Sequence, residues 1–238
     1  MNIGVFDSGI GGLTVLEELI RELPHCNFFF YGDNKNNPYG DKSDEELIRI
    51  TSGVVDELNK KGCRMIVIAC GTATTRCMDR LQELYPDNIF IGTVPAVKTA
   101  CEKDYRNIMV MATTATITSA KLKEIIDENI REGQNIYPVA CPGLADAIEA
   151  NDEKAIGRIL NRIRREYRDK NIDAIVLGCT HYPFIRDEIQ KKFPKAVLMD
   201  SARGVARAAR CQLRESGLMV DEKEKGTLEV TFTRKKAA

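Results

Sequence analysis

Two pairs of matching segments are the feature that most constrains the fold of this chain. Residues 2–20, "NIGVFDSGIGGLTVLEELI", match residues 107–126, "NIMVMATTATITSAKLKEII". Residues 65–81, "MIVIACGTATTRCMDRL", match residues 174–189, "AIVLGCTHYPFIRDEI". Both pairs are offset by about one hundred residues, and self-similarity at a fixed offset indicates an internal repeat. The chain is therefore predicted to contain two related domains.

Within each predicted domain, short apolar runs alternate with amphipathic helical patterns. This order favours a mostly parallel sheet with helices on both faces. The predicted fold class is α/β, with two pseudo-symmetric, mostly parallel-sheet α/β domains facing across a cleft. We expect the first domain to comprise residues 1–94 and 205–238, and the second residues 95–204. In the first domain, strands are expected at residues 2–6, 26–33, 64–70 and 88–94, and helices at residues 12–23, 43–62 (after a Ser43 cap) and 74–85.

Charge and cysteine content narrow the functional classes. The formal net charge is zero, which argues against direct binding to nucleic acid or to an anionic membrane. No apolar run approaches membrane-spanning length, and no basic segment precedes the first apolar run, so we expect a cytoplasmic protein. The eight cysteines form no CxxC pair and the chain has only two histidines, which favours free thiols over a metal site.

Two cysteines stand at equivalent positions of the repeat. Cys70 and Cys179 each end an apolar run, with threonine following closely. Ligands of open parallel sheets bind outside the carboxyl ends of the strands. Asp7 and Ser8, and residues 113–119, follow the other two matched strands. If the two domains face each other, the two cysteines lie on opposite walls of one cleft.

Two facing thiols suggest a specific chemistry. A free cysteine has a pKa near 8.5, and a helix N-terminus or a cationic histidine can lower that pKa. One thiolate could remove a proton from a weakly acidic carbon while a thiol on the other side delivers one. That reaction inverts a stereocentre without a cofactor. The hydroxyl groups of the surrounding serines and threonines could hold a carboxylate.

A series of motifs along the chain resembles those of glutamate racemase, in the cofactor-independent aspartate/glutamate racemase superfamily. They occur in family order from Asn2 to about Ala208: "GVFDSGIGGLTV", "YGDNKNNPYGDKS", "VIACGTAT", "GTVPAVK", "ATTATITS", "ACPGLADAIE" and "GCTHYPFI". The resemblance implies an isomerase that interconverts L- and D-glutamate by two-thiol proton transfer and supplies D-glutamate for peptidoglycan. It also implies two pseudo-symmetric domains, no cofactor and no metal, the small amino acid glutamate as the substrate, and a homodimer.

The resemblance further implies the site residues. The paired thiols match Cys70 and Cys179, with the first assigned to the D-enantiomer and the second to the L-enantiomer. The acidic and imidazole helpers match Asp7 and His181, with Glu149 as a third. The substrate-binding residues of the family match Ser8, Pro38, Tyr39, Gly40, Thr72, Thr113, Thr116 and Thr180, and Gly71 stands where the family has asparagine.

Gly71 is the main departure from the family pattern, which reads Asn-Thr-Ala after the first cysteine. Glycine keeps the backbone N–H but removes an amide that contacts the bound amino acid, and losing a hydrogen bond to a charged group costs about 1.5–3 kcal/mol. Two alternatives therefore stay open at this point. One is a racemase for aspartate or another acidic amino acid. The other is a weakly active relative that serves as a binding protein.

Simpler interpretations apply to the remaining residues. Cys26, Cys63, Cys77, Cys101, Cys141 and Cys211 are interpreted as buried thiols of the core, because free cysteine behaves as a small apolar residue. Asp7 and Ser8 are also suitable helix caps. The "GIGG" turn resembles a phosphate loop but lacks the complete GxGxxG spacing, which makes a nucleotide site a weak alternative.

Overall fold

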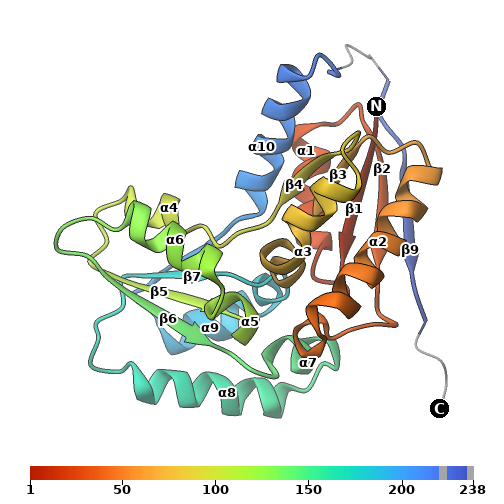
Figure 1. Ribbon diagram of the computed structural model, residues 1–238. Helices are drawn as coiled ribbons and strands as arrows, with labels where there is room; N and C mark the ends of the chain where they lie inside the picture. Colours follow the sequence, from red (N-terminus) through yellow and green to blue (C-terminus); the bar gives the residue numbers. More distant parts are fainter. Residues whose placement is uncertain (220–223, 235–238) are drawn as a thin grey trace. The chain divides into compact units, whose positions relative to one another are not determined.

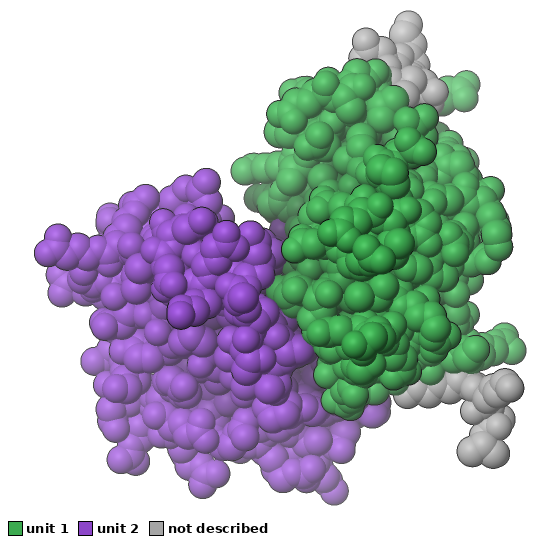
Figure 2. Space-filling model, viewed as in Figure 1, with its two compact units in different colours: residues 1–93, 202–238 green, residues 94–201 purple. Residues whose placement is uncertain are grey.

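The computed structural model describes residues 1–219 and 224–234. The chain divides into two compact units, which Figure 2 shows in different colours. Unit 1 contains Met1–Thr93 and Ala202–Ala238, and unit 2 contains Val94–Ser201. Each unit is built around its own parallel sheet.

The sheet of unit 1 has five strands in the order β4-β3-β1-β2-β9, and every pair of neighbours is parallel. The central strand β1 carries the burial pattern expected of a strand covered on both faces, because five of its six residues are buried. The edge strand β9 comes from the late part of the chain and pairs with β2 (Figure 1). The strands are β1 (Asn2–Asp7), β2 (Asn27–Gly32), β3 (Met65–Ile68), β4 (Ile89–Gly92) and β9 (Leu228–Phe232).

Helices cover both faces of this sheet. On one face, α1 (Leu13–Glu22) packs beside α10 (Ala202–Glu215), and Leu16 and Ala206 belong to the same apolar core. On the other face, α2 (Asp44–Lys60) packs beside α3 (Gly71–Leu84). The short helix η1 (Tyr39–Asp41) precedes α2. Ser43 caps α2 by accepting a hydrogen bond from the Glu46 backbone N–H, as its sequence position predicts.

The sheet of unit 2 has four parallel strands in the order β6-β5-β7-β8. Alternate residues of the central strand β5 enter different cores, with Val110 on one face and Met111 on the other. Pro138 lies in the edge strand β6, a position that tolerates proline because an edge strand has a neighbour on one side only and can do without one N–H donor. The strands are β5 (Asn107–Ala112), β6 (Asn135–Ala140), β7 (Ala174–Leu177) and β8 (Val197–Asp200).

The helices of unit 2 also form two layers. The core on one face includes residues of α4 (Val97–Cys101) and α6 (Ala120–Asn129), with the single turn α5 (Thr114–Ile117) between β5 and α6. The core on the other face includes residues of α7, α8, η2 and α9. These elements are α7 (Leu144–Glu149), α8 (Glu153–Glu166), η2 (Tyr182–Ile185) and α9 (Arg186–Lys192).

The predicted α/β class with two mostly parallel sheets is confirmed, and the matched strands hold equivalent places. β1 and β5 are the central six-residue strands of their sheets, and β3 and β7 are their four-residue neighbours. Two details differ from the sequence prediction. Helix α3 begins at Gly71 rather than at Thr74, because Cys70 has the extended backbone of an N-cap residue. Cys211 was expected in the core but is exposed, because it lies on the outer side of α10.

Among the described residues, no helix combines the length and the apolar character needed to cross a bilayer.

Candidate active site

The predicted site residues follow strands at the two places where the chain order of a sheet reverses. In unit 1, β1 lies between β2 and β3, so the carboxyl ends of β1 and β3 are adjacent. In unit 2, β5 lies between β6 and β7, and the carboxyl ends of β5 and β7 are adjacent. Such switch points are where open α/β sheets bind ligands. Each unit therefore presents a thiol at this position, Cys70 in unit 1 and Cys179 in unit 2.

Cys70 is the N-cap residue of α3 and is buried. Its Sγ lies 3.8 Å from Oγ of Ser8, which follows β1. The Cys70 side chain makes no capping hydrogen bond to α3, and the backbone N–H groups of the first turn, beginning at Gly71, point toward the end of the helix where the thiol lies. The helix dipole favours a negative charge at this end. Thr72, in the same turn, is also buried.

Asp7 ends β1 and is fully buried. Its Oδ2 accepts a hydrogen bond of 2.8 Å from the backbone N–H of Gly12. A Cβ at residue 12 would lie only 2.6 Å from the Cβ of Asp7, so this close approach requires glycine. The "GIGG" turn thus directs an amide at the chain's own carboxylate, which argues against its use as a phosphate loop.

Tyr39 connects the polar loop that follows β2 to the carboxyl end of that strand by a hydrogen bond. The phenol donates a hydrogen bond of 2.9 Å to Oδ2 of Asp33, and both residues are almost fully buried. Burial raises the pKa of Tyr39 far above its ordinary value, and the negative charges of Asp33, Cys70 and Asp7 raise it further. The phenol is therefore a permanent donor. The predicted residues Pro38, which is half-buried, and Gly40, which is exposed, flank it on the loop.

Two residues that are not among the predicted site residues, Asp33 and Arg76, hold this loop. Asp33 also accepts hydrogen bonds from Asn36 at 2.8 Å and from Thr233, beyond β9, at 2.9 Å. Arg76 of α3 donates to the backbone carbonyl of Lys42 at 2.7 Å and to the Asp44 carboxylate at 2.7 Å. The strand-end rule could have identified Asp33, because it directly follows β2, but nothing local identifies Arg76.

In unit 2, three predicted residues form a chain of contacts. Sγ of Cys179 lies 3.7 Å from Nδ1 of His181, and Nε2 of the same ring lies 2.7 Å from Oε1 of Glu149, the last residue of α7. When Nε2 carries the proton that Glu149 accepts, Nδ1 can take a proton from the thiol. This arrangement has the order of a nucleophile, a base and a residue that orients the base. His181 is almost fully buried, whereas Cys179 is half-buried.

The predicted threonines of unit 2 lie at the same edge. Thr113 is the N-cap of α5, where its Oγ1 accepts a hydrogen bond of 3.3 Å from the Thr116 N–H. The two hydroxyl oxygens lie 3.1 Å apart. Thr180, between Cys179 and His181, is buried. Hydroxyl groups near a thiol provide donors for a carboxylate and acceptors for an ammonium group.

The predicted residues thus divide into two clusters, each described within its own unit. Residues 7, 8, 38–40 and 70–72 belong to unit 1, and residues 113, 116, 149 and 179–181 belong to unit 2. All eight cysteines are free thiols. Within the described part of the chain, no three histidine, cysteine, aspartate or glutamate side chains cluster as metal ligands would.

Comparison with known proteins gives consistent matches. Residues 8–209 match the family model described as Asp/Glu/Hydantoin racemase. Glutamate racemase of Clostridium perfringens strain 13 is 39% identical over 232 residues, which are 96% of this chain and 89% of that protein. The crystal structure of glutamate racemase isoform RacE1 from Bacillus anthracis superposes with a TM-score of 0.82 at 30% identity, covering 97% of this chain and 86% of that one. A Francisella tularensis glutamate racemase solved in complex with D-glutamate gives a TM-score of 0.82 at 29% identity, covering 98% and 88%.

Proposed function

The chain belongs to the Asp/Glu/Hydantoin racemase family, and from this premise we propose that it interconverts L- and D-glutamate. The choice of glutamate is supported by the curated relatives, which are named glutamate racemase at 37–39% identity over nearly the full chain. It is also supported by the neighbour solved with D-glutamate. Among family substrates, glutamate is therefore preferred over aspartate, the first alternative that the sequence left open.

The proposed mechanism is two-base proton transfer at Cα. The Cys179 thiolate removes the α-proton of L-glutamate, and the Cys70 thiol donates its proton to the opposite face, which gives D-glutamate. The reaction leaves Cys70 as thiolate and Cys179 as thiol, the correct state for the reverse reaction. The observation that carries this proposal is the Cys179–His181–Glu149 chain, which can move the proton of Cys179. The mechanism requires that both units deliver their thiols to one substrate molecule.

The chain's own groups have definite tasks in this mechanism. The N-terminus of α3 stabilises the Cys70 thiolate, and the nearby Ser8 hydroxyl can donate to it. The hydroxyls of Thr72, Thr113 and Thr180 and the backbone N–H groups of their turns hold the two carboxylates of glutamate. Tyr39, kept neutral by burial, fixes the loop that contributes Pro38 and Gly40.

The biological role follows from the product. We propose that D-glutamate made by this protein enters peptidoglycan, and that the protein works in the cytoplasm, where reducing conditions keep its thiols free. The homodimer implied by the family resemblance stays a prediction that analytical ultracentrifugation can test.

The deciding experiment follows glutamate in D2O by circular dichroism and by NMR of the Cα hydrogen. Wild-type protein without pyridoxal phosphate should abolish the optical activity of L-glutamate and place deuterium at Cα of the D-product. Cys70→Ala and Cys179→Ala should each slow racemisation by at least about a hundredfold, because each removes one of the two proton-transfer groups. Cys211→Ala, which removes an exposed thiol outside both clusters, should leave the rate unchanged. If either catalytic-cysteine variant racemises at the wild-type rate, the two-thiol mechanism is wrong.

A further inference from the structure

A cavity of about 450 Å³ lies in unit 2 at the opposite end of the sheet from Cys179. It is bordered by the ends of α8 and α9 and by the loop that leads into β7. This volume is within the range of small-molecule sites. The side chains that give the cavity its chemical character are Arg164, Tyr167, Arg168, Lys192, Phe193 and Lys195.

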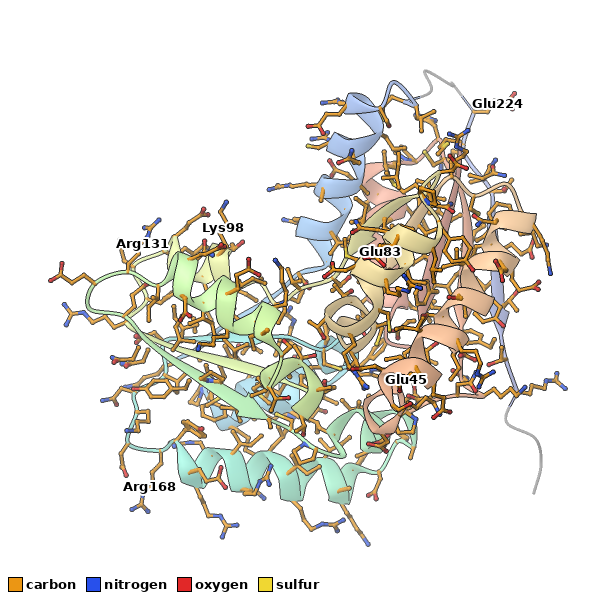
Figure 3. The ribbon with its side chains drawn as sticks, viewed as in Figure 1. Glu45, Glu83, Lys98, Arg131, Arg168 and Glu224 are labelled. Carbon is orange, nitrogen blue, oxygen red and sulfur yellow. The ribbon has the colours of Figure 1, made fainter. Side chains whose placement is uncertain are left out.

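The lining of this cavity is strongly basic, although the chain as a whole has zero formal charge. Its lining includes four cationic residues and a single acidic residue, Asp173. Oδ2 of Asp173 is already engaged, because it accepts hydrogen bonds from the backbone N–H groups of Arg106 at 3.0 Å and Asn107 at 2.9 Å. Arg168 makes a solvent-exposed contact of 3.2 Å with Asp169, and such pairs contribute little. Figure 3 shows Arg168 beyond the end of α8.

We propose that this cavity is a binding site for a small, soluble phosphate-bearing molecule with at least two negative charges. Lysine ammonium groups bind phosphate as point charges, and arginine can donate two parallel hydrogen bonds to phosphate oxygens. The cavity supplies both types from two separate helix ends. It is larger than a phosphate group needs, and the half-buried Tyr167 ring borders the remaining space.

A simpler explanation for basic residues at these places is the helix dipole. Cations in the last turn of a helix are stabilising in themselves. That explanation applies equally to Arg165 and Lys191, which occupy the last turns of α8 and α9 but do not line the cavity. It does not apply to Arg168 and Lys195, which lie beyond the two helices and do line it. Substituting Arg168 and Lys195 tests the ligand site, whereas substituting Arg165 and Lys191 tests the helix-dipole explanation.

The site is distinct from the candidate active site. Asp173 directly precedes β7, and Cys179 follows its other end. At a rise of about 3.3 Å per residue, the six residue steps between them span roughly 20 Å. Glutamate should therefore not compete for the cavity.

The test is isothermal titration of the whole protein with inorganic pyrophosphate and, separately, with AMP, at constant ionic strength. Three proteins are compared: wild type, Arg168→Ala/Lys195→Ala, and the control Arg165→Ala/Lys191→Ala. Both double variants remove two positive charges at exposed positions of the same helix ends, so both should fold. Circular dichroism checks that they do, and racemase activity should be unchanged in both.

We expect saturable binding of at least one probe to wild type. The cavity variant should weaken this binding by about tenfold or more, whereas the control should change it by less than about twofold. Tighter binding of pyrophosphate would assign a diphosphate, and tighter binding of AMP would assign a nucleoside monophosphate. Saturating glutamate should leave the affinity unchanged. The proposal is overturned if neither probe binds wild type at concentrations below about 10 mM. It is also overturned if the two double variants lose affinity equally, or if glutamate displaces the probe.

Discussion

Nε2 of His181 lies 2.7 Å from Oε1 of Glu149, and both side chains are largely shielded from solvent. Because the other ring nitrogen faces Sγ of Cys179 at 3.7 Å, this carboxylate controls the proton that the ring can exchange with the thiol. A negative charge at Glu149 stabilises the imidazolium that forms when His181 takes a proton. The relationship connects α7 to the strand end of β7 within one unit.

We expect Glu149→Gln to reduce kcat by about 10- to 100-fold, because a charge-assisted hydrogen bond worth about 1.5–3 kcal/mol becomes a neutral one. The kcat/KM values for L- and for D-glutamate should fall by the same factor, since the equilibrium constant between enantiomers is one. Steady-state kinetics in both directions measures the effect, and a thermal melt separates it from unfolding. Glu166→Gln, an exposed change near the end of α8, is the control. An unchanged kcat in Glu149→Gln would show that the carboxylate has only a structural part.

A second prediction concerns Arg76, which holds the loop of Tyr39 and Gly40 through the Lys42 carbonyl and the Asp44 carboxylate. Arg76→Ala should raise KM for glutamate by about tenfold and change kcat much less, because the loop must then be ordered by the substrate. Arg80→Ala is a matched control, since Arg80 lies one turn further along α3 and pairs with the exposed Glu83. A fall in kcat at constant KM would contradict a role in positioning the binding loop.

The third prediction tests the glycine that departs from the family pattern. Gly71 is the first residue of α3, and its backbone φ is negative, so asparagine can adopt the same conformation. Gly71→Asn should lower KM for glutamate by about tenfold, because it adds the amide that the resemblance places against the amino acid. The same substitution at Gly53, an exposed helical glycine of unit 1, should leave KM unchanged. A rise in KM would instead indicate a pocket shaped around glycine.

The sequence was most informative where chemistry and secondary structure coincide. Matched apolar runs ending in Cys70 and Cys179 were enough to predict two parallel sheets with thiols at their carboxyl ends, because strand order and ligand position are linked in this fold class. The residues that position the loop could not be found in this way. Asp33 meets Thr233, two hundred residues away, and the backbone carbonyl bound by Arg76 carries no sequence signal. Such contacts depend on tertiary packing alone.

The start of α3 is a second feature that the local sequence does not predict. Threonine is a weak helix former, and all five residues from Gly71 to Thr75 are small or carry a hydroxyl group. Local propensity therefore placed the helix start too late. In the structure, packing of Ala73 and Cys77 into the core beneath the sheet overrides that propensity.

The last prediction concerns stability at alkaline pH. Burial raises the pKa of Cys63 to about 12, of Cys77 to about 11 and of Cys141 to about 12. An unfolded chain releases these thiol protons near pH 8.5, whereas the folded protein keeps them, so the folded state binds more protons above that pH. The free energy of unfolding should be fully retained below about pH 8.5 and should fall as pH rises toward about 11. Each such thiol contributes a slope of up to about 1.4 kcal/mol per pH unit.

Urea unfolding followed by far-UV circular dichroism at a series of pH values measures this slope. Cys141→Ala should make the free energy of unfolding fall less steeply with pH in the alkaline range. The difference should correspond to about one bound proton, because one titrating thiol is removed. Val139→Ala removes apolar volume from the same core of unit 2 without removing a proton. That control should lower the free energy of unfolding at every pH and leave the slope as in wild type. If Cys141→Ala and wild type lose stability with the same slope, the buried thiol of Cys141 is not a source of the alkaline sensitivity.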